Sequence, residues 1–246
     1  RLSPHVPGWE NTPLQAMLEE EFGAPARVDN DANVAALGEH RFGAGQGCDH
    51  ISYLTVSTGV GGGWILNGQP WRGAQGMAGE IGHTVVDPNG PVCLCGKRGC
   101  VERLASGSYM AQDARNRLQA QPEQGKILRT LARGDLSNVT GKMIAEAAAR
   151  GDDLAWELLE RSAWALGVGI GNAANLINPQ RFVLGGGVTK AGRRYWEAIR
   201  RVARETALPE VRFDIVPAAL GDDAPLWGAV AIVLATRHPG KDKAEN

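Results

Sequence analysis

The stretch Ile51-Ser-Tyr-Leu-Thr-Val-Ser-Thr-Gly-Val-Gly-Gly-Gly-Trp-Ile-Leu66 decides the fold, because it joins two apolar segments through a run of glycines. Residues 51–56 have the composition of a buried strand, and residues 64–66 predict a second strand that ends at an Asn67-Gly68 turn. The glycine run is therefore expected between two strands. Glycine loops that bind dinucleotides usually join a strand to a helix, so this context argues against that fingerprint and favours a hairpin that contacts phosphate.

Helices and short strands are expected on both sides of this hairpin. The helix that starts at Pro13 should end before Gly23, and the longest helix should be capped by Asp152 and stopped by Asn178-Pro179. The polar stretch 119–140 is interpreted as surface. With 33 glycines and 13 prolines at turn positions, the chain is expected to be an α/β enzyme. The further helices are predicted at 32–42, 108–118, 141–150, 195–206 and 224–236, and the further strands at 26–28, 181–184 and 211–216.

The composition excludes several classes of protein. Hydrophobic residues make up 43% of the chain and charged residues 22%, which argues against disorder. The formal net charge of −1 gives no broad basic surface for nucleic acid or an anionic membrane. No signal peptide is visible after the initial Arg-Leu-Ser-Pro, and no apolar run approaches the roughly 18 residues that span a bilayer. We therefore expect a cytoplasmic protein with neither a nucleic-acid nor a membrane partner.

A group of cysteines follows a histidine at a spacing typical of a metal site. Gly79-Glu-Ile-Gly-His83 is followed by Cys93-Leu-Cys95 and then by Gly96-Lys-Arg-Gly-Cys100. One imidazole and three thiolates form a closed tetrahedral set for Zn²⁺, which leaves no position for a water and therefore predicts a structural ion. Unmetallated cysteines or one disulfide are the alternative. Cys48 lies outside the group and is expected to be a small buried residue.

Three carboxylates are candidates for chemistry. Asp31, in Asp29-Asn30-Asp31, opens a predicted helix, where a carboxylate can accept a hydroxyl proton but can equally serve as a helix cap. Glu80 and Glu102 flank the cysteine loop, so folding of that loop would direct both toward a pocket suited to a sugar, with surface solvation as the alternative. The glycines at 185–187 follow a buried strand, where backbone amides can approach a nucleotide.

Four segments together resemble the ROK family of bacterial sugar kinases and sugar-responsive repressors, and are nearest to its glucokinases. They are Asp29-Asn-Asp-Ala-Asn-Val-Ala-Ala-Leu-Gly-Glu39, Leu54-Thr-Val-Ser-Thr-Gly-Val-Gly-Gly-Gly63, Gly79-Glu-Ile-Gly-His83 and Cys93-x-Cys-Gly-x-x-Gly-Cys-x-Glu102. The resemblance covers essentially the whole chain. It implies an actin/hexokinase-like (ribonuclease H-like) α/β ATPase fold of two lobes. The smaller lobe would comprise residues 1–46 and 223–246, and the larger lobe residues 47–222 with a zinc loop at 83–100.

The resemblance also implies an activity and roles for single residues. The chain would be an ATP-dependent hexose kinase, with glucose the favoured hexose, Mg²⁺ carried in by ATP, structural Zn²⁺, and assembly into a homodimer or higher homo-oligomer. Asp31 would be the base on the sugar 6-hydroxyl. The expected sugar contacts are Asn30, Asp31, Glu80, His83 and Glu102. The expected zinc ligands are His83, Cys93, Cys95 and Cys100, and the expected nucleotide contacts are Thr58, Gly59, Gly61, Gly185, Gly186 and Gly187.

One motif of the family kinases does not occur in the sequence. They carry Asp-x-Gly-Gly-Thr-Lys, whose backbone and Asp hold the phosphates and Mg²⁺, whereas Gly185-Gly-Gly-Val-Thr-Lys190 lacks the Asp. We therefore expect a first lobe that is incomplete at its N-terminal end and weak binding of Mg-ATP. A catalytically impaired sugar-binding or regulatory member of the family, or a fragment of a longer kinase, is the alternative.

Overall fold

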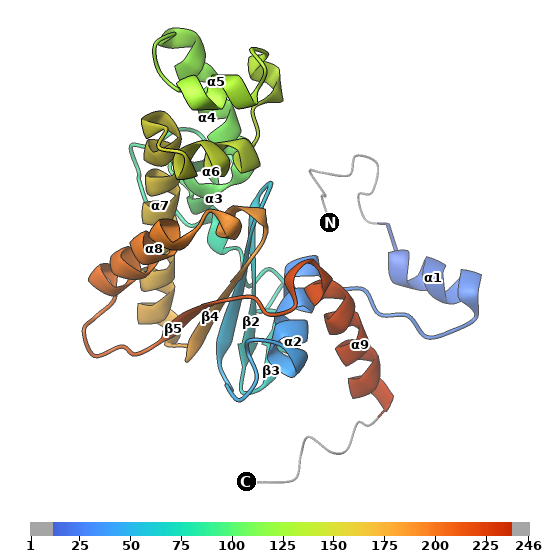
Figure 1. Ribbon diagram of the computed structural model, residues 1–246. Coiled ribbons are helices and arrows are strands. Elements are labelled where there is room, and N and C mark those ends of the chain that lie inside the picture. Colours follow the sequence, from blue (N-terminus) through green and yellow to red (C-terminus); the bar gives the residue numbers. More distant parts are fainter. Residues whose placement is uncertain (1–11, 238–246) are drawn as a thin grey trace. The chain divides into compact units, whose positions relative to one another are not determined.

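The computed structural model describes residues 12–237 (Figure 1). The chain divides into two compact units between Asp31 and Ala32. In the first unit, helix α1 (Leu14–Phe22) ends as predicted at Gly23, whose φ of 59° suits a residue without a side chain. The strand predicted at 26–28 is wrong, because residues 26–28 form no ladder within the described chain. The Ala26 N–H is instead bonded to the Glu19 carboxylate.

The second unit is built on a mixed five-stranded sheet of order β3-β2-β1-β4-β5. Antiparallel pairing joins β1 to β2 and β2 to β3, whereas β4 lies parallel to both β1 and β5. The chain therefore returns to the sheet through long helical crossovers, as an α/β fold requires. The strands are β1 (Ile51–Val56), β2 (Val60–Leu66), β3 (Gln69–Trp71), β4 (Arg181–Gly185) and β5 (Asp214–Pro217).

Apolar side chains alternate between the two faces of this sheet. Leu54 and Phe182 belong to one core with the helices α3, α4, α7 and α8, whereas Tyr53 and Val183 belong to a second core with α2 and α9. Figure 1 shows α7 and α8 on one side of the strands and α2 and α9 on the other. The sheet is thus covered on both faces. These helices span Asp31–Phe42 (α2), Val101–Ala105 (α3), Gly107–Ala120 (α4), Asp153–Ile177 (α7), Arg193–Thr206 (α8) and Ala224–Arg237 (α9).

The long helix α7 begins and ends where the sequence predicts. The Asp152 carboxylate accepts the Ala155 N–H as an N-cap, and Asn178 adopts a left-handed conformation at the C-terminus. The interpretation of 119–140 as surface is wrong in part. This stretch contains helix α5 (Lys126–Leu131), in which Leu128 is fully buried, and it precedes helix α6 (Gly141–Ala149).

The glycine loop between the first two strands is much shorter than predicted. Strand β2 already begins at Val60, so the glycines at 61, 62 and 63 lie inside the strand and only residues 57–59 form the turn. The Asn67-Gly68 turn is confirmed, with positive φ at both residues. Cys48 is buried, as expected.

The two-lobe division at 46/47 and 222/223 stays a prediction; the division into compact units is a separate one and falls between Asp31 and Ala32. None of the helices between residues 12 and 237 combines the length and the apolar character needed to cross a membrane.

Candidate functional site

The glycines of β2 allow two other segments to approach its backbone closely. A Cβ at Gly63 would lie 2.7 Å from the Ala32 carbonyl oxygen, so the first turn of α2 packs directly on this face. On the opposite face, a Cβ at Gly62 would lie 2.8 Å from the carbonyl oxygen of Gly79. The start of β2 is therefore held between α2 and the segment that leads to His83.

A second close approach fixes Glu80 and His83. A Cβ at Gly82 would lie 2.0 Å from the Val60 carbonyl oxygen, and Gly79 has a φ of 99° that L side chains rarely adopt. The short helix η1 (Ile81–His83) is thus pressed against the first residue of β2. The Glu80 side chain is exposed, and its carboxylate has no partner among residues 12–237.

His83 and three cysteines form a compact cluster at the end of this segment. Their ligand atoms all lie within 4.8 Å of one another, and the Sγ atoms of Cys95 and Cys100 are 3.5 Å apart. Zn–S bonds of about 2.3 Å in a tetrahedron require S–S separations of roughly 3.8 Å, so this set fits one zinc ion. The fourth ligand is Cys93, whose Sγ lies 3.9 Å from Nδ1 of His83.

The cysteines differ in exposure and in proton affinity. Burial, followed by the neighbouring thiols, raises the pKa of Cys100 to about 12. A hydrogen bond from the Lys97 backbone N–H is the main cause that lowers the pKa of the exposed Cys95. The turn from Cys93 to Gly96 is closed by a 2.9 Å backbone hydrogen bond.

Glu102 follows the last cysteine and contacts the turn at residues 57–60. Its Oε2 atom accepts the Val60 N–H at 3.0 Å, and a Cβ at Gly59 would lie 2.8 Å from the same oxygen. The other carboxylate oxygen accepts no hydrogen bond from residues 12–237. Glu80, His83 and Glu102 are therefore all positioned by contacts with the beginning of β2.

A pocket of about 910 Å³ lies beside the same turn. Ser57 and Thr58 form one wall, Gly187 and Lys190 another, and the N-terminal half of α4 and the length of α6 most of the rest. Because Gly107 of α4 and Gly141 of α6 lack side chains, these two helix N-termini approach so closely that a Cβ on Gly141 would lie 3.0 Å from the Gly107 Cα. This volume is in the range of pockets that hold cofactors.

The charges around the pocket favour an anionic ligand. The lining contains three cationic side chains, Arg115, Lys142 and Lys190, and one carboxylate, Glu146. Glu146 is paired with Arg150, and Lys190 with Asp222 at 3.8 Å, both pairs being exposed. The N-termini of α4 and α6 add the positive ends of two helix dipoles.

The predicted nucleotide residues separate into two groups. Thr58 and Gly187 line the pocket. The other four do not line it. Gly59 lies against the Glu102 carboxylate, Gly61 pairs with Thr55, and Gly185 packs on Tyr53. A Cβ at Gly186 would lie 2.4 Å from the Val56 carbonyl oxygen. Gly186 has a φ of 91°, so this position requires glycine for two reasons.

Asn30 and Asp31 lie at the junction of the two units. Asp31 is the first residue of α2, and the Asn30 N–H is bonded to the Asp29 carboxylate at 2.9 Å. Both residues belong to the first unit, whereas Glu80, His83 and Glu102 belong to the second. A joint role of the two groups is therefore part of the proposal below.

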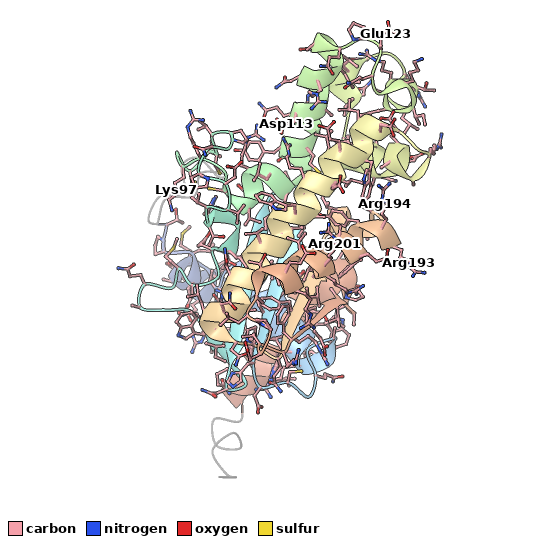
Figure 2. All side chains as sticks on the ribbon, turned by 90° about the vertical axis from the view of Figure 1, so that its left-hand side faces the viewer. Lys97, Asp113, Glu123, Arg193, Arg194 and Arg201 are labelled. Atoms are coloured by element: carbon pink, nitrogen blue, oxygen red, sulfur yellow. The ribbon has the colours of Figure 1, made fainter. Side chains whose placement is uncertain are left out.

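Two carboxylates with little or no exposed surface were not expected from the sequence. Asp113 of α4 forms a bidentate ion pair with Arg103 at 2.9 Å and also binds Arg161, beside the long helix α7 in Figure 2. Arg103 in turn donates to the Val92 carbonyl of the 83–100 loop. Burial acts to raise the pKa of Asp113, but hydrogen bonds from Arg103 and Arg161 outweigh it and hold the pKa below its ordinary value.

The other is Glu39, which is fully buried near the C-terminal end of α2. Its carboxylate accepts the backbone N–H groups of Ala44, Ala219 and Leu220. It thereby joins α2 to the connection that follows β5. Glu39 closes the first quoted motif, but nothing in its local pattern separates it from a surface glutamate.

Known proteins resemble this chain along almost all of its length. A model of the ROK family matches residues 2–236. The glucokinase of Halalkalibacterium halodurans is 42% identical over 226 residues, which cover 90% of this chain and 67% of that protein. The xylose repressor of Caldicellulosiruptor bescii is 30% identical over 236 residues, which cover 95% and 58%. A crystal structure of a ROK family glucokinase from Streptomyces griseus in complex with glucose and AMPPNP matches with a TM-score of 0.83 and 38% identity, covering 94% of this chain and 75% of that chain.

Proposed function

Because this chain belongs to the ROK family and has the actin/hexokinase-like α/β fold of its glucokinases, we propose that it is an ATP-dependent hexose kinase that phosphorylates the sugar 6-hydroxyl. One observation carries the proposal. Thr58 lines the 910 Å³ pocket, and two residues later the Val60 N–H is held by Glu102. A single short turn thus separates the pocket for the nucleotide from the side chains for the sugar.

The sugar side of the site consists of groups that pair well with hydroxyls. The exposed carboxylate of Glu80 and the second carboxylate oxygen of Glu102 can accept hydroxyl protons, and the Asn30 amide can both donate and accept. His83 adds the face of an imidazole whose Nδ1 atom points at the cysteines. The S. griseus relative was crystallised with glucose, which makes glucose the expected hexose.

The nucleotide side is the pocket between the 57–60 turn and residues 187–190. We assign it to ATP because the same relative holds AMPPNP and because the lining is rich in cations. Mg²⁺ would arrive with the nucleotide and would neutralise charge on its phosphates. Thr58 and Gly187 would contact the nucleotide directly, and Gly59, Gly61, Gly185 and Gly186 would allow the backbone to approach it.

Asp31 is the proposed base. It would accept the proton of the 6-hydroxyl as that oxygen bonds to the γ-phosphorus and the bond from phosphorus to the bridging oxygen of ADP breaks. Since phosphoryl transfer needs mainly positioning and charge stabilisation, the other residues have to hold the two substrates in line. Zinc held by His83, Cys93, Cys95 and Cys100 would supply rigidity to the loop before Glu102 and no reacting group.

The test compares two aspartates that each begin a helix. Asp31→Asn should retain hexose binding, because an amide still forms hydrogen bonds, but should lower turnover by about 10²- to 10⁴-fold. Asp153→Asn, at the first residue of α7, removes the same charge from another helix start and should leave turnover unchanged. Sugar 6-phosphate formation and calorimetric sugar binding are the measurements. Equal losses of sugar binding and turnover in Asp31→Asn would instead assign Asp31 to binding or to capping.

A sugar-binding regulator is the second candidate, because a xylose repressor shares 30% identity with the chain. It predicts that the wild-type protein binds a hexose by calorimetry and forms no sugar phosphate with Mg-ATP.

For either function we also propose a homodimer or higher homo-oligomer in the cytoplasm, and two lobes that divide near residues 46 and 222. Light scattering measures the first property and limited proteolysis the second.

A further inference from the structure

The 57–60 turn is held by two neighbouring residues at the start of α4. The Gly107 N–H donates to the Ser57 carbonyl oxygen at 2.7 Å, and the Ser108 hydroxyl donates to the Thr58 carbonyl oxygen. Inside the turn, the Ser57 N–H is bonded to the Gly59 carbonyl at 2.9 Å. Two consecutive carbonyl groups therefore point toward α4.

The direction of these carbonyls also sets the direction of the amides. In a planar trans peptide the C=O and N–H point in opposite directions, so the N–H groups of Thr58 and Gly59 point away from α4. Neither N–H has an acceptor among residues 12–237. Successive unpaired amides of this kind form a concave site for an anion. The Ser108 hydroxyl thus fixes the peptide whose N–H belongs to Gly59.

The residues that hold the turn are rigidly connected to the cysteine cluster. Cys100 occupies the N-cap position of α3, and Glu102 lies in its first turn. The Val101 N–H donates to the Thr84 carbonyl at 3.0 Å, and the Ser106 N–H donates to the Glu102 carbonyl at 3.0 Å. Seven residues therefore lead from Cys100 to Gly107, and the one non-helical residue between α3 and α4, Ser106, is fully buried.

Buried contacts prevent α3 from moving independently. Val101 and Ala105 are almost completely buried, and the Ala105 carbonyl accepts the hydroxyl of the buried Ser162 at 3.1 Å. Ser162 is also bonded to the Tyr195 hydroxyl of α8 at 2.8 Å. A displacement of Cys100 would therefore be transmitted through α3 to the turn, because the packed core around α3 leaves little room to absorb it.

We propose that Ser108, together with Glu102, is a positioning residue that locks the 57–60 turn to the metal loop, so that zinc binding and nucleotide binding strengthen each other. This inference rests on the proposed function, in which the turn contacts the phosphates of ATP. Glu102 holds the Val60 end of the turn and Ser108 the Thr58 end. By thermodynamic linkage, the factor by which zinc tightens the nucleotide equals the factor by which the nucleotide tightens zinc.

The test measures zinc binding as well as nucleotide binding. In the wild-type protein, Mg-AMPPNP should lower the Kd for zinc, measured by equilibrium competition with a chromophoric chelator, by about 5-fold or more. Ser108→Ala should raise the Kd for Mg-AMPPNP by about 3- to 10-fold, as expected for one lost hydrogen bond, and should bring the ratio of the zinc Kd values without and with Mg-AMPPNP close to one. Glucose affinity should stay unchanged in this variant.

Two further variants serve as controls. Ser108→Thr keeps the hydroxyl and should restore both the Kd and the ratio. Thr130→Ala removes a hydroxyl that donates to a backbone carbonyl of α5 at 2.9 Å outside the pocket, and it should behave as wild type. Because Ser108 is exposed and alanine favours helices, circular dichroism should show an intact fold for Ser108→Ala.

The outcomes separate this inference from the proposed function. If the wild-type protein binds no Mg-AMPPNP, both are overturned. If it binds Mg-AMPPNP but Ser108→Ala changes neither the Kd nor the zinc ratio, the inference alone is overturned. A weaker Kd with an unchanged zinc ratio would mean that Ser108 contacts the nucleotide directly, and it would also overturn the positioning role.

Discussion

Replacing Glu39 with glutamine tests how the helix that begins at Asp31 is held in the second unit. The Glu39 carboxylate has no exposed surface. Its Oε2 atom accepts the Ala44 N–H at 2.8 Å and the Ala219 N–H at 3.1 Å, and its Oε1 atom accepts the Leu220 N–H at 2.8 Å. Three backbone donors thus converge on one negative charge.

Glutamine preserves the volume but cannot satisfy all three donors. Its oxygen can replace Oε2, but its NH₂ group then faces the Leu220 N–H, and two donors oppose each other. A hydrogen bond to a charged acceptor contributes about 1.5–3 kcal/mol, and a buried donor left without a partner costs about 1–3 kcal/mol. We therefore expect Glu39→Gln to lower the free energy of unfolding by about 3 kcal/mol.

Urea unfolding followed by circular dichroism measures this change, provided that the slope of the transition stays constant. Glu205→Gln is the matched control, because Glu205 lies on the exposed surface of α8 and pairs only with Arg201. An exposed pair of this kind contributes less than about 1 kcal/mol. If Glu39→Gln were no less stable than Glu205→Gln, water or another acceptor would be satisfying the donors, and the role assigned to Glu39 would be wrong.

Two further predictions concern the cysteine loop and its anchor. Cys95→Ser should reduce bound zinc below about one ion per chain. It should also lower the melting temperature and the sugar affinity together, because loss of a ligand releases the loop that leads to Glu102. A metal-free wild-type protein with an unchanged melting temperature would contradict this. Asp113→Asn should destabilise the protein by about 3 kcal/mol at neutral pH, since Arg103 and Arg161 lose a charged partner that is only 13% exposed. Because the pKa of Asp113 is lowered in the folded state, this stabilisation is complete above the ordinary carboxyl pKa near 3.8 and is lost as the pH falls through the folded value. The difference between variant and wild type in urea titrations should therefore shrink below about pH 4, and a constant difference would contradict the ion-pair explanation.

Much of the fold follows from local sequence patterns. The strand at 51–56 has a strong apolar pattern, and the 25-residue helix α7 has both an apolar pattern and clear caps. Both elements are confirmed with almost the predicted boundaries. The cysteine and histidine spacing likewise predicted a cluster that the structure assembles within 4.8 Å. These features depend on residues close together in the chain.

The errors arise where distant contacts decide the structure. Residues 26–28 have strand-like composition but no neighbouring strand within residues 12–237, and an isolated strand has no ladder to stabilise it. The glycines at 62 and 63 have low strand propensity, yet they lie in β2, where the carbonyl oxygens of Gly79 and Ala32 approach too closely for any side chain. Glu39 and Asp113 could not be recognised because their partners lie far away in the sequence.

The glycine row of β2 has a consequence for how the protein tolerates substitution. At Gly62, Gly63 and Gly82 an added methyl group would collide with backbone atoms, which cannot rotate aside as a flexible side chain can. At Gly187 the structure leaves open space around a Cβ, although this residue also borders the pocket. A mutational scan of the glycines should therefore divide by the kind of atom each would meet and not by distance from the pocket, with room for a side chain at position 187 and for a methyl group at position 61, and almost none at positions 62, 63 and 82.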